Sequence, residues 1–187
     1  PSFEDGDTGM FDSITIPDWR IIGTGGDLHD DASGPVYAGS QAVALNTFGT
    51  QIRQDFTVTA GDSYVFSVKV LSSSSAPLVG TDVLLYTKWY NAVPSSGSKI
   101  SEFETGIFVS GTDPEDAWRT LSGRLTAPAG AAYGRLIVSL ESAVTSGSIN
   151  VDQASVREIN TAADLSGDDM VNYVDFALLA SDWQQSS

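Results

Sequence analysis

Short runs of alternating apolar and polar residues dominate the chain between about residue 11 and residue 159. The clearest run spans 64–70, where Ser67 and Lys69 separate the apolar side chains at 66, 68 and 70. Successive side chains of a strand point to opposite faces, so such a run predicts a strand with one buried face. The same pattern predicts strands at 13–22, 42–45, 51–59, 64–70, 82–90, 102–109, 118–126, 133–140 and 148–156. Gly, Pro, Ser and Asp turns separate these nine strands, which is typical of an all-β sandwich of two sheets.

The chain changes character after Ile159. From Thr161 onward it contains five Asp, no Lys or Arg, and the only run with helical spacing. We therefore expect two units, a β-sandwich over residues 1–159 and a short C-terminal segment over residues 160–187.

The C-terminal segment contains a candidate calcium loop over residues 164–175. Oxygen-bearing side chains stand at positions one, three, five, nine and twelve of this loop, and a main-chain carbonyl at position seven completes a shell for a hard cation. The predicted ligands are Asp164, Ser166, Asp168, the carbonyl of Met170, Asn172 and Asp175. Position six, usually Gly, is Asp169, which tolerates a left-handed backbone better than most residues.

An apolar stripe follows the loop at helical spacing, formed by Phe176, Leu179 and Trp183. The loop and stripe resemble half of a dockerin, whose repeat carries such a loop with Asp at position twelve and then a short helix. The resemblance implies a calcium-dependent docking surface. The stripe packs either on the chain's own sandwich or on another protein chain, and the sequence leaves both open.

Composition limits the partners. The formal net charge is −15, which makes nucleic acid and anionic membranes poor partners. There is no cysteine, so disulfides and thiolate chemistry are excluded. No run approaches the ~18 apolar residues of a membrane span, so we expect no membrane insertion. The chain begins with Pro1 rather than Met, from which we expect that a segment upstream was removed. The cysteine-free composition, rich in Gly, Ser, Thr and Asp and with few Lys, suits an extracellular protein.

Several short segments occur in an order that resembles the carbohydrate-binding modules of families 4, 9, 16 and 22. They are residues 1–6, Trp19, residues 39–42, residues 127–131 and residues 150–156. The resemblance covers residues 1–159 and implies a jelly-roll sandwich. It also implies a calcium that ties the first strand to the last, with Glu4, the backbone near Gly39 or Gln41, and Asp152 as ligands.

The residues around Asp152 suggest a reason for such a site. Asp152 shares strand parity with Ala154 and Val156, so we expect it to point to the apolar side. A buried carboxylate requires a cation or several N–H donors. The alternative is an Asp that caps a turn.

The predicted strand 82–90 offers a candidate glycan platform. Tyr86, Lys88 and Tyr90 lie on one face and Trp89 on the other, and only one face can be core. Arg135, on an outward face of the predicted strand 133–140, would assist. The alternative is an ordinary solvated strand face. Trp19 and Trp118 match core positions of the resembling modules, so both are expected to be buried.

Catalysis is not expected. Glu102 and Glu104 have a spacing seen in glycosidase carboxylate pairs, but such i, i+2 pairs are common on strands. The single histidine, His29, lies in a polar stretch that we interpret as a surface loop.

Two functions remain. The first is a secreted, non-catalytic glycan-binding module with a calcium-dependent docking tail, whose partner is a polysaccharide or another protein. The second is a self-assembling structural subunit of an extracellular filament or surface coat, whose tail docks on the neighbouring copy.

Overall fold

The computed structural model describes Phe3, Gly9–Met10 and residues 18–159. This part of the chain contains strands and no helix, and therefore no helix that could cross a bilayer. The strands are β1 (Gly9–Met10), β2 (Arg20–Ile22), β3 (Gly26–Asp30), β4 (Gln41–Leu45), β5 (Gln51–Thr57), β6 (Ser63–Ser72), β7 (Val83–Tyr90), β8 (Lys99–Phe108), β9 (Arg119–Thr126), β10 (Tyr133–Leu140) and β11 (Ile149–Ile159).

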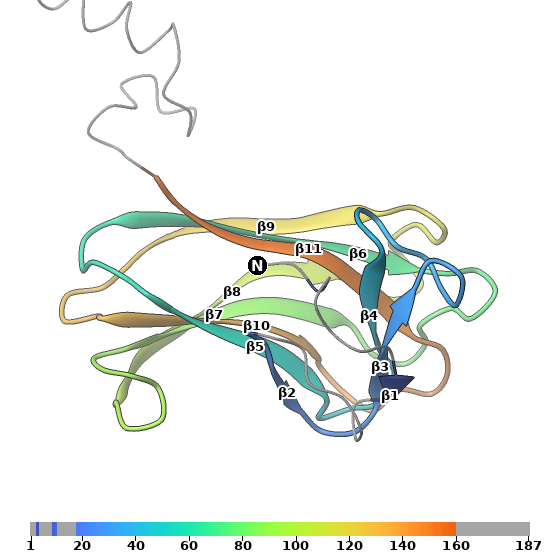
Figure 1. The fold of residues 1–187 in the computed structure, drawn as a ribbon, viewed down its shortest axis with the longest axis horizontal. Helices are drawn as coiled ribbons and strands as arrows, with labels where there is room; N and C mark the ends of the chain where they lie inside the picture. Colours follow the sequence, from blue (N-terminus) through green and yellow to red (C-terminus); the bar gives the residue numbers. More distant parts are fainter. Residues whose placement is uncertain (1–2, 4–8, 11–17, 160–187) are drawn as a thin grey trace, which may run out of the picture.

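The strands form two antiparallel sheets that pack face to face. The six-stranded sheet has the order β1-β3-β4-β11-β6-β9, and the five-stranded sheet has the order β2-β5-β10-β7-β8. Figure 1 shows the two layers, with β6, β9 and β11 above and β2, β5 and β10 below. From β4 to β11 every connection except β7 to β8 crosses from one sheet to the other. The prediction of an all-β sandwich is therefore confirmed.

The core lies between the sheets and is built around Trp89 of β7, which is fully buried. Its ring contacts the rings of Phe56, Tyr64 and Phe66, with ring centroids 6.0–6.3 Å apart. Removing such a side chain typically costs about 3–5 kcal/mol. Trp89 therefore joins the five-stranded sheet to β6 of the other sheet.

Trp19 and Trp118, the two other tryptophans predicted to lie in the core, differ in their burial. Trp19 is buried, as predicted, and its ring centroid lies 4.9 Å from that of Phe3. The prediction for Trp118 is wrong. It lies just before β9, is only half-buried, and contacts the exposed ring of Tyr37 edge-on at 5.6 Å. The prediction came from the resemblance to carbohydrate-binding modules and from a predicted strand 118–126, whereas β9 begins at Arg119, so Trp118 precedes the strand.

Two glycines bring the strands β8 and β9 together at one side of the sandwich. A Cβ atom on Gly123 would lie 2.7 Å from the Cβ atom of Thr105, and one on Gly106 would lie 3.0 Å from that of Leu121. Larger residues would force the sheets apart here. Within its own sheet, β8 is an edge strand that pairs only with β7.

Some sequence predictions fall on residues outside the described part of the chain. They comprise the C-terminal unit 160–187, with all its calcium ligands and its apolar stripe, the ligand Glu4, and the start of the predicted strand 13–22. Within the described residues, β3 was not predicted, because the sequence Gly-Asp-Leu-His-Asp lacks an alternating apolar pattern.

Candidate functional site

The outer face of the five-stranded sheet carries the predicted platform. Leu85, Thr87 and Trp89 of β7 are buried toward the core, so Tyr86 and Lys88 point outward and are half-buried. The question that the sequence left open, which face of this strand is core, is settled by the packing of Trp89.

Strand pairing places five outward residues in a row across this sheet. From β2 to β8 the row is Arg20, Arg53, Ile137, Tyr86 and Glu104. Ile137 faces outward yet is only 1% exposed, so its neighbours cover it. The row therefore has a buried apolar centre, cations at the β2 end and a carboxylate at the β8 end.

A hollow of about 380 Å³ opens next to this row, a size suited to a small ligand. It is lined by Phe48, Gly49, Gln51, Leu84, Tyr86, Glu102, Glu104, Ser139, Leu140 and Glu141. Ser139 of β10 is 9% exposed, and its hydroxyl has no hydrogen-bond partner among the described residues. A buried polar group usually has such a partner. The hollow thus combines a tyrosine ring, carboxylate oxygens and an unpartnered hydroxyl.

Salt bridges organise the β7 and β8 side of the face. Glu102 accepts a hydrogen bond from Lys99 Nζ at 2.8 Å and lies 3.4 Å from Lys88 Nζ. These contacts hold the pKa of Glu102 below its usual value, Lys99 being the main cause. Lys88 Nζ also lies 5.2 Å from the centroid of the Tyr86 ring. Lys88 therefore helps to neutralise the carboxylate of Glu102 and restricts the orientation of the Tyr86 ring.

The other two predicted ligand residues bury each other. Arg135 of β10 makes a two-pronged contact with Asp55, Nε to Oδ1 at 2.5 Å and Nη2 to Oδ2 at 2.8 Å. Its guanidinium carbon lies 5.4 Å from the centroid of the Tyr90 ring, and Arg135 and Tyr90 are only 7% and 9% exposed. The structure thus brings the four predicted residues onto one face, with Tyr86 and Lys88 accessible and Tyr90 and Arg135 buried beside them.

On the six-stranded sheet, the segment 31–40 between β3 and β4 lies over the outer face. Asp152 of β11 is 3% exposed beneath it. Its Oδ2 accepts hydrogen bonds from the backbone N–H groups of Tyr37 at 2.8 Å and Ala38 at 3.1 Å, and its Oδ1 accepts one from Gln153 at 2.5 Å. The N–H donors that could replace a cation are therefore present. A calcium ion at this position stays a prediction.

The expected direction of the Asp152 side chain is wrong. The pairing of β11 with β6 is irregular between Asp152 and Ser155, and Gln153 has φ of 46°. Such a β-bulge places two residues opposite one and shifts the alternation by one position. Asp152 therefore points outward, although Ala154 beyond the bulge points to the core.

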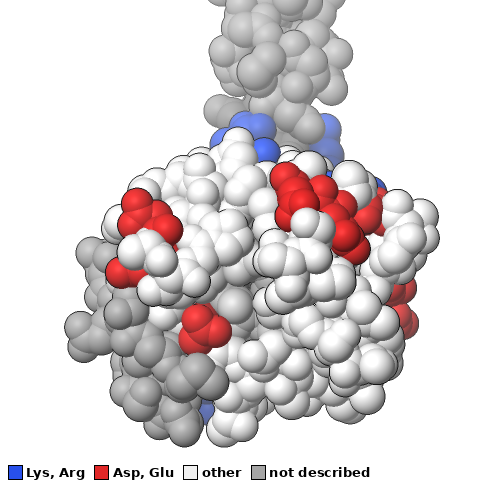
Figure 2. All heavy atoms as spheres, turned by 90° about the vertical axis from the view of Figure 1, so that its right-hand side faces the viewer, with Lys and Arg blue, Asp and Glu red and all other residues white. Residues whose placement is uncertain are grey.

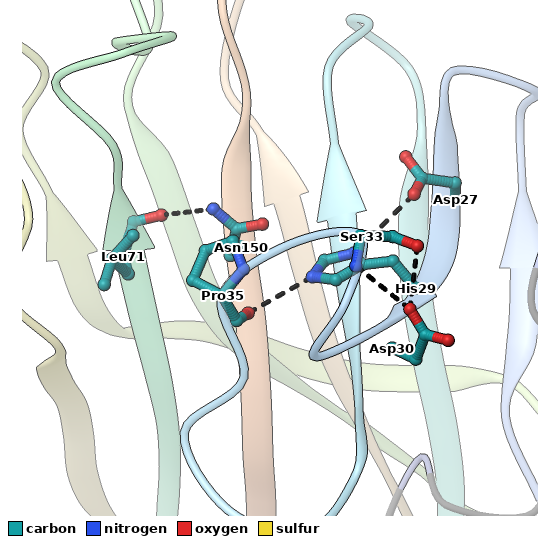
Figure 3. A network of polar contacts seen from close by, with 7 residues as sticks. All are labelled: Asp27, His29, Asp30, Ser33, Pro35, Leu71 and Asn150. Atoms are coloured by element: carbon teal, nitrogen blue, oxygen red, sulfur yellow. Dashed lines mark hydrogen bonds and ion pairs between the residues drawn. The ribbon is translucent and has the colours of Figure 1, made fainter.

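His29 is not in a surface loop, so that prediction is also wrong. It belongs to β3, is 5% exposed, and its Nε2 lies 3.2 Å from the carbonyl oxygen of Pro35, to which it donates (Figure 3). Its Nδ1 lies 3.6 Å from Asp27 Oδ2. Burial opposes protonation, but Asp27 and the Pro35 carbonyl outweigh it, so the pKa of His29 is raised above 6.5.

At one end of the sandwich, acidic side chains lie in separate patches rather than in one centre (Figure 2). Figure 2 shows the end of the sandwich at the right of Figure 1, where acidic groups form separate patches on a largely uncharged surface. Among the described residues no group of three or more His, Cys, Asp or Glu side chains could hold a metal ion.

Sequence reasoning missed two residues of the open face. Arg53 and Ser139 occupy outward positions of β5 and β10, and their alternation with Ile52, Gln54, Val138 and Leu140 could have identified them. Their proximity to Tyr86 depends on strand order, which alternation does not reveal.

Comparisons with known proteins support the fold. No family model matches the chain, and no curated protein matches it. Solved structures, however, do match the chain. A family 22 carbohydrate-binding module from xylanase 10B of Clostridium thermocellum, studied for the role of its cleft in ligand binding, is 16% identical with a TM-score of 0.53. The match covers 83% of this chain and 94% of that one.

Two other structures widen the comparison. The N-terminal part of the same xylanase, complexed with xylohexaose, is 16% identical with a TM-score of 0.54 over 80% of this chain, which spans only 27% of that one. The K1 cleaved adhesin domain of Lys-gingipain from Porphyromonas gingivalis is 14% identical with a TM-score of 0.51, covering 84% of this chain and 95% of that one. These likenesses establish that the chain has the two-sheet sandwich fold of carbohydrate-binding modules.

Proposed function

We propose that this chain is a secreted, non-catalytic glycan-binding module that binds a polysaccharide on the outer face of its five-stranded sheet. The observation that carries the proposal is the hollow beside Tyr86. Sugar rings present flat C–H faces and many hydroxyl groups, so an aromatic ring beside polar acceptors and donors suits them. Tyr86, Ser139 and Glu104 supply these chemistries on three adjacent strands.

The similar structures support this choice, because one is a module whose cleft takes part in ligand binding and another contains xylohexaose. Xylan is therefore the first polysaccharide to test. Lysine and arginine side chains stabilise the face beneath the ligand, and the carboxylates of Glu102 and Glu104 accept hydrogen bonds from sugar hydroxyls rather than carry out hydrolysis.

The test compares two tyrosines on opposite sheets. Tyr86→Ala should weaken binding to xylohexaose by roughly five- to thirtyfold, because one stacking aromatic contributes on the order of 1–2 kcal/mol. Tyr37→Ala is the matched control, since the Tyr37 side chain is accessible to solvent, as that of Tyr86 is in part, but lies over the six-stranded sheet. Isothermal titration calorimetry measures both. Equal affinities for wild type and Tyr86→Ala would refute the proposed site.

Calcium binding by the C-terminal loop is the second part of the proposal, and the loop sequence alone supports it. Asp164→Ala combined with Asp175→Ala should remove one calcium ion per chain, as measured by equilibrium dialysis. Asp31→Ala combined with Glu115→Ala removes the same charge from exposed positions of the sandwich and should leave the stoichiometry unchanged. Unchanged stoichiometry in the first variant would refute the loop site. Docking on a protein partner and assembly into filaments stay predictions of the sequence.

A further inference from the structure

Three arginines cluster on the open face with one carboxylate among them. Arg20 of β2 is the cross-strand partner of Arg53 of β5, and Arg135 of β10 lies on the neighbouring strand. The carboxylate is Asp55, and Arg135 binds both of its oxygens. The whole chain contains only 9 Lys and Arg. A third of them therefore gather at this place, although the net charge of the chain is −15.

Arg53 is the least satisfied of the three. Its Nε is buried without a hydrogen-bond partner, and neither Arg53 nor Arg20 has an ion-pair partner among the described residues. Burial, then the charges of Arg135 and Arg20, lowers the pKa of Arg53. Like charges at close range destabilise one another, and a buried N–H group without a partner costs free energy. An anion bound here would offset both costs.

The position of the cluster relates it to the proposed glycan site. Arg53 and Tyr86 lie in one row across the sheet, separated by the strand β10. Two strand spacings amount to about 10 Å between the backbones, and the long arginine side chain shortens that gap. At the opposite end of the row stands Glu104, which would repel an anion. The row therefore has an electrostatic direction, attractive to a negative group at β5 and unfavourable to one at β8.

We infer that the glycan bound by this face carries an anionic substituent, a carboxylate or a sulfate ester, and that Arg53 together with Arg20 binds it. The inference rests on the proposed function, because it names the class of glycan bound at the same face. Guanidinium groups present N–H donors in a planar fork that matches such oxyanions. The net negative charge of the protein does not prevent this contact, since at physiological ionic strength repulsion from distant charges is screened beyond about 8 Å.

The experiment compares three ligands of equal length by calorimetry. They are xylohexaose, the same oligosaccharide bearing one glucuronate, and the same oligosaccharide bearing one sulfate ester. Wild-type protein should bind at least one of the charged ligands about tenfold more tightly than xylohexaose, since a charge-assisted hydrogen bond is worth at least that much. The preferred ligand identifies the anionic group.

The variant Arg53→Gln should bind the charged and neutral ligands with equal affinity. Arg124→Gln removes the same charge from β9 of the other sheet and should retain the preference. A second measurement uses the wild-type protein and therefore does not depend on the folding of a variant. The NMR resonance of the Arg53 Nε–H group should shift when the charged ligand is added and should not shift when xylohexaose is added.

The outcomes separate the two proposals. Equal binding of all three ligands by wild type, or a preference that persists in Arg53→Gln, would overturn the inference and leave the glycan site intact. Binding of none of the three ligands would overturn both.

Discussion

The outer faces of the two sheets are built from the same kind of strand, but one is covered by a loop and the other is open. On the six-stranded sheet, the segment 31–40 covers polar groups, and Asp152 and His29 beneath it are bound by backbone groups. On the five-stranded sheet, Tyr86, Arg53 and Ser139 remain partly or wholly without partners among the described residues. A polar group with satisfied partners stabilises a fold, whereas one that lacks them is available to a ligand.

The comparison predicts that removing a carboxylate from the covered face destabilises the fold more than removing one from the open face. Asp152→Ala should lower the free energy of unfolding by about 3 kcal/mol, because three backbone N–H groups lose their acceptor beneath the segment 31–40. Glu104→Ala, on the open face, should change it by no more than about 0.5 kcal/mol. Urea denaturation measures both values.

Asp152→Asn provides a control, because the amide retains one acceptor oxygen. Its free energy of unfolding should lie between those of wild type and Asp152→Ala. If Asp152→Ala proved as harmless as Glu104→Ala, the distinction between a structural face and a binding face would be lost.

A smaller effect should appear in the pH dependence of stability. The pKa of His29 is raised in the folded protein, so its protonation stabilises the fold fully below the ordinary value of 6.5 and this contribution is lost as pH rises through the raised value. His29→Gln preserves a donor for the Pro35 carbonyl and removes the titrating group. The melting temperature of wild type relative to this variant should fall between pH 5 and pH 8, on the order of a degree or two.

His29 lies on the covered face, so the same substitution should leave glycan affinity unchanged across that pH range. A melting-temperature difference that rose with pH would contradict the assigned partners Asp27 and Pro35.

Alternation in the sequence was sufficient for the fold class and for separating the two faces of β7, but not for deciding which face is core. It placed Trp89 opposite Tyr86, and the packing of Trp89 against β6 confirms that Tyr86 faces outward. Alternation failed where a residue's direction depends on something other than position in a regular strand. The bulge at Gln153 reversed the direction expected of Asp152. The prediction for Trp118 came from the resemblance to carbohydrate-binding modules rather than from alternation, and it failed because Trp118 lies just outside β9.

The candidate site was predictable in part. Tyr86 and Lys88 were named from one strand, but the hollow next to them is lined by residues of four strands, β5, β7, β8 and β10, of which β5 and β10 lie far from β7 in the sequence. Arg53 escaped notice because its significance lies in its place beside Arg20 and Arg135, where Arg135 binds both oxygens of the one neighbouring carboxylate, Asp55. Strand order alone reveals this arrangement. The covered face differs from the open face because the segment 31–40 lies over it. The Gly, Pro and Ser residues of this segment indicate a loop but do not indicate which face the loop covers.

The most direct test of the account is to map the ligand contact on the folded protein. Backbone amide resonances of the isotopically labelled chain would be followed during titration with xylohexaose and with its glucuronate-bearing form. We predict that the largest shifts occur in β5, β7, β8 and β10, around Tyr86 and, for the charged ligand, Arg53. Shifts confined to β3, β4 and β11 with the segment 31–40, or no shifts at all, would contradict it.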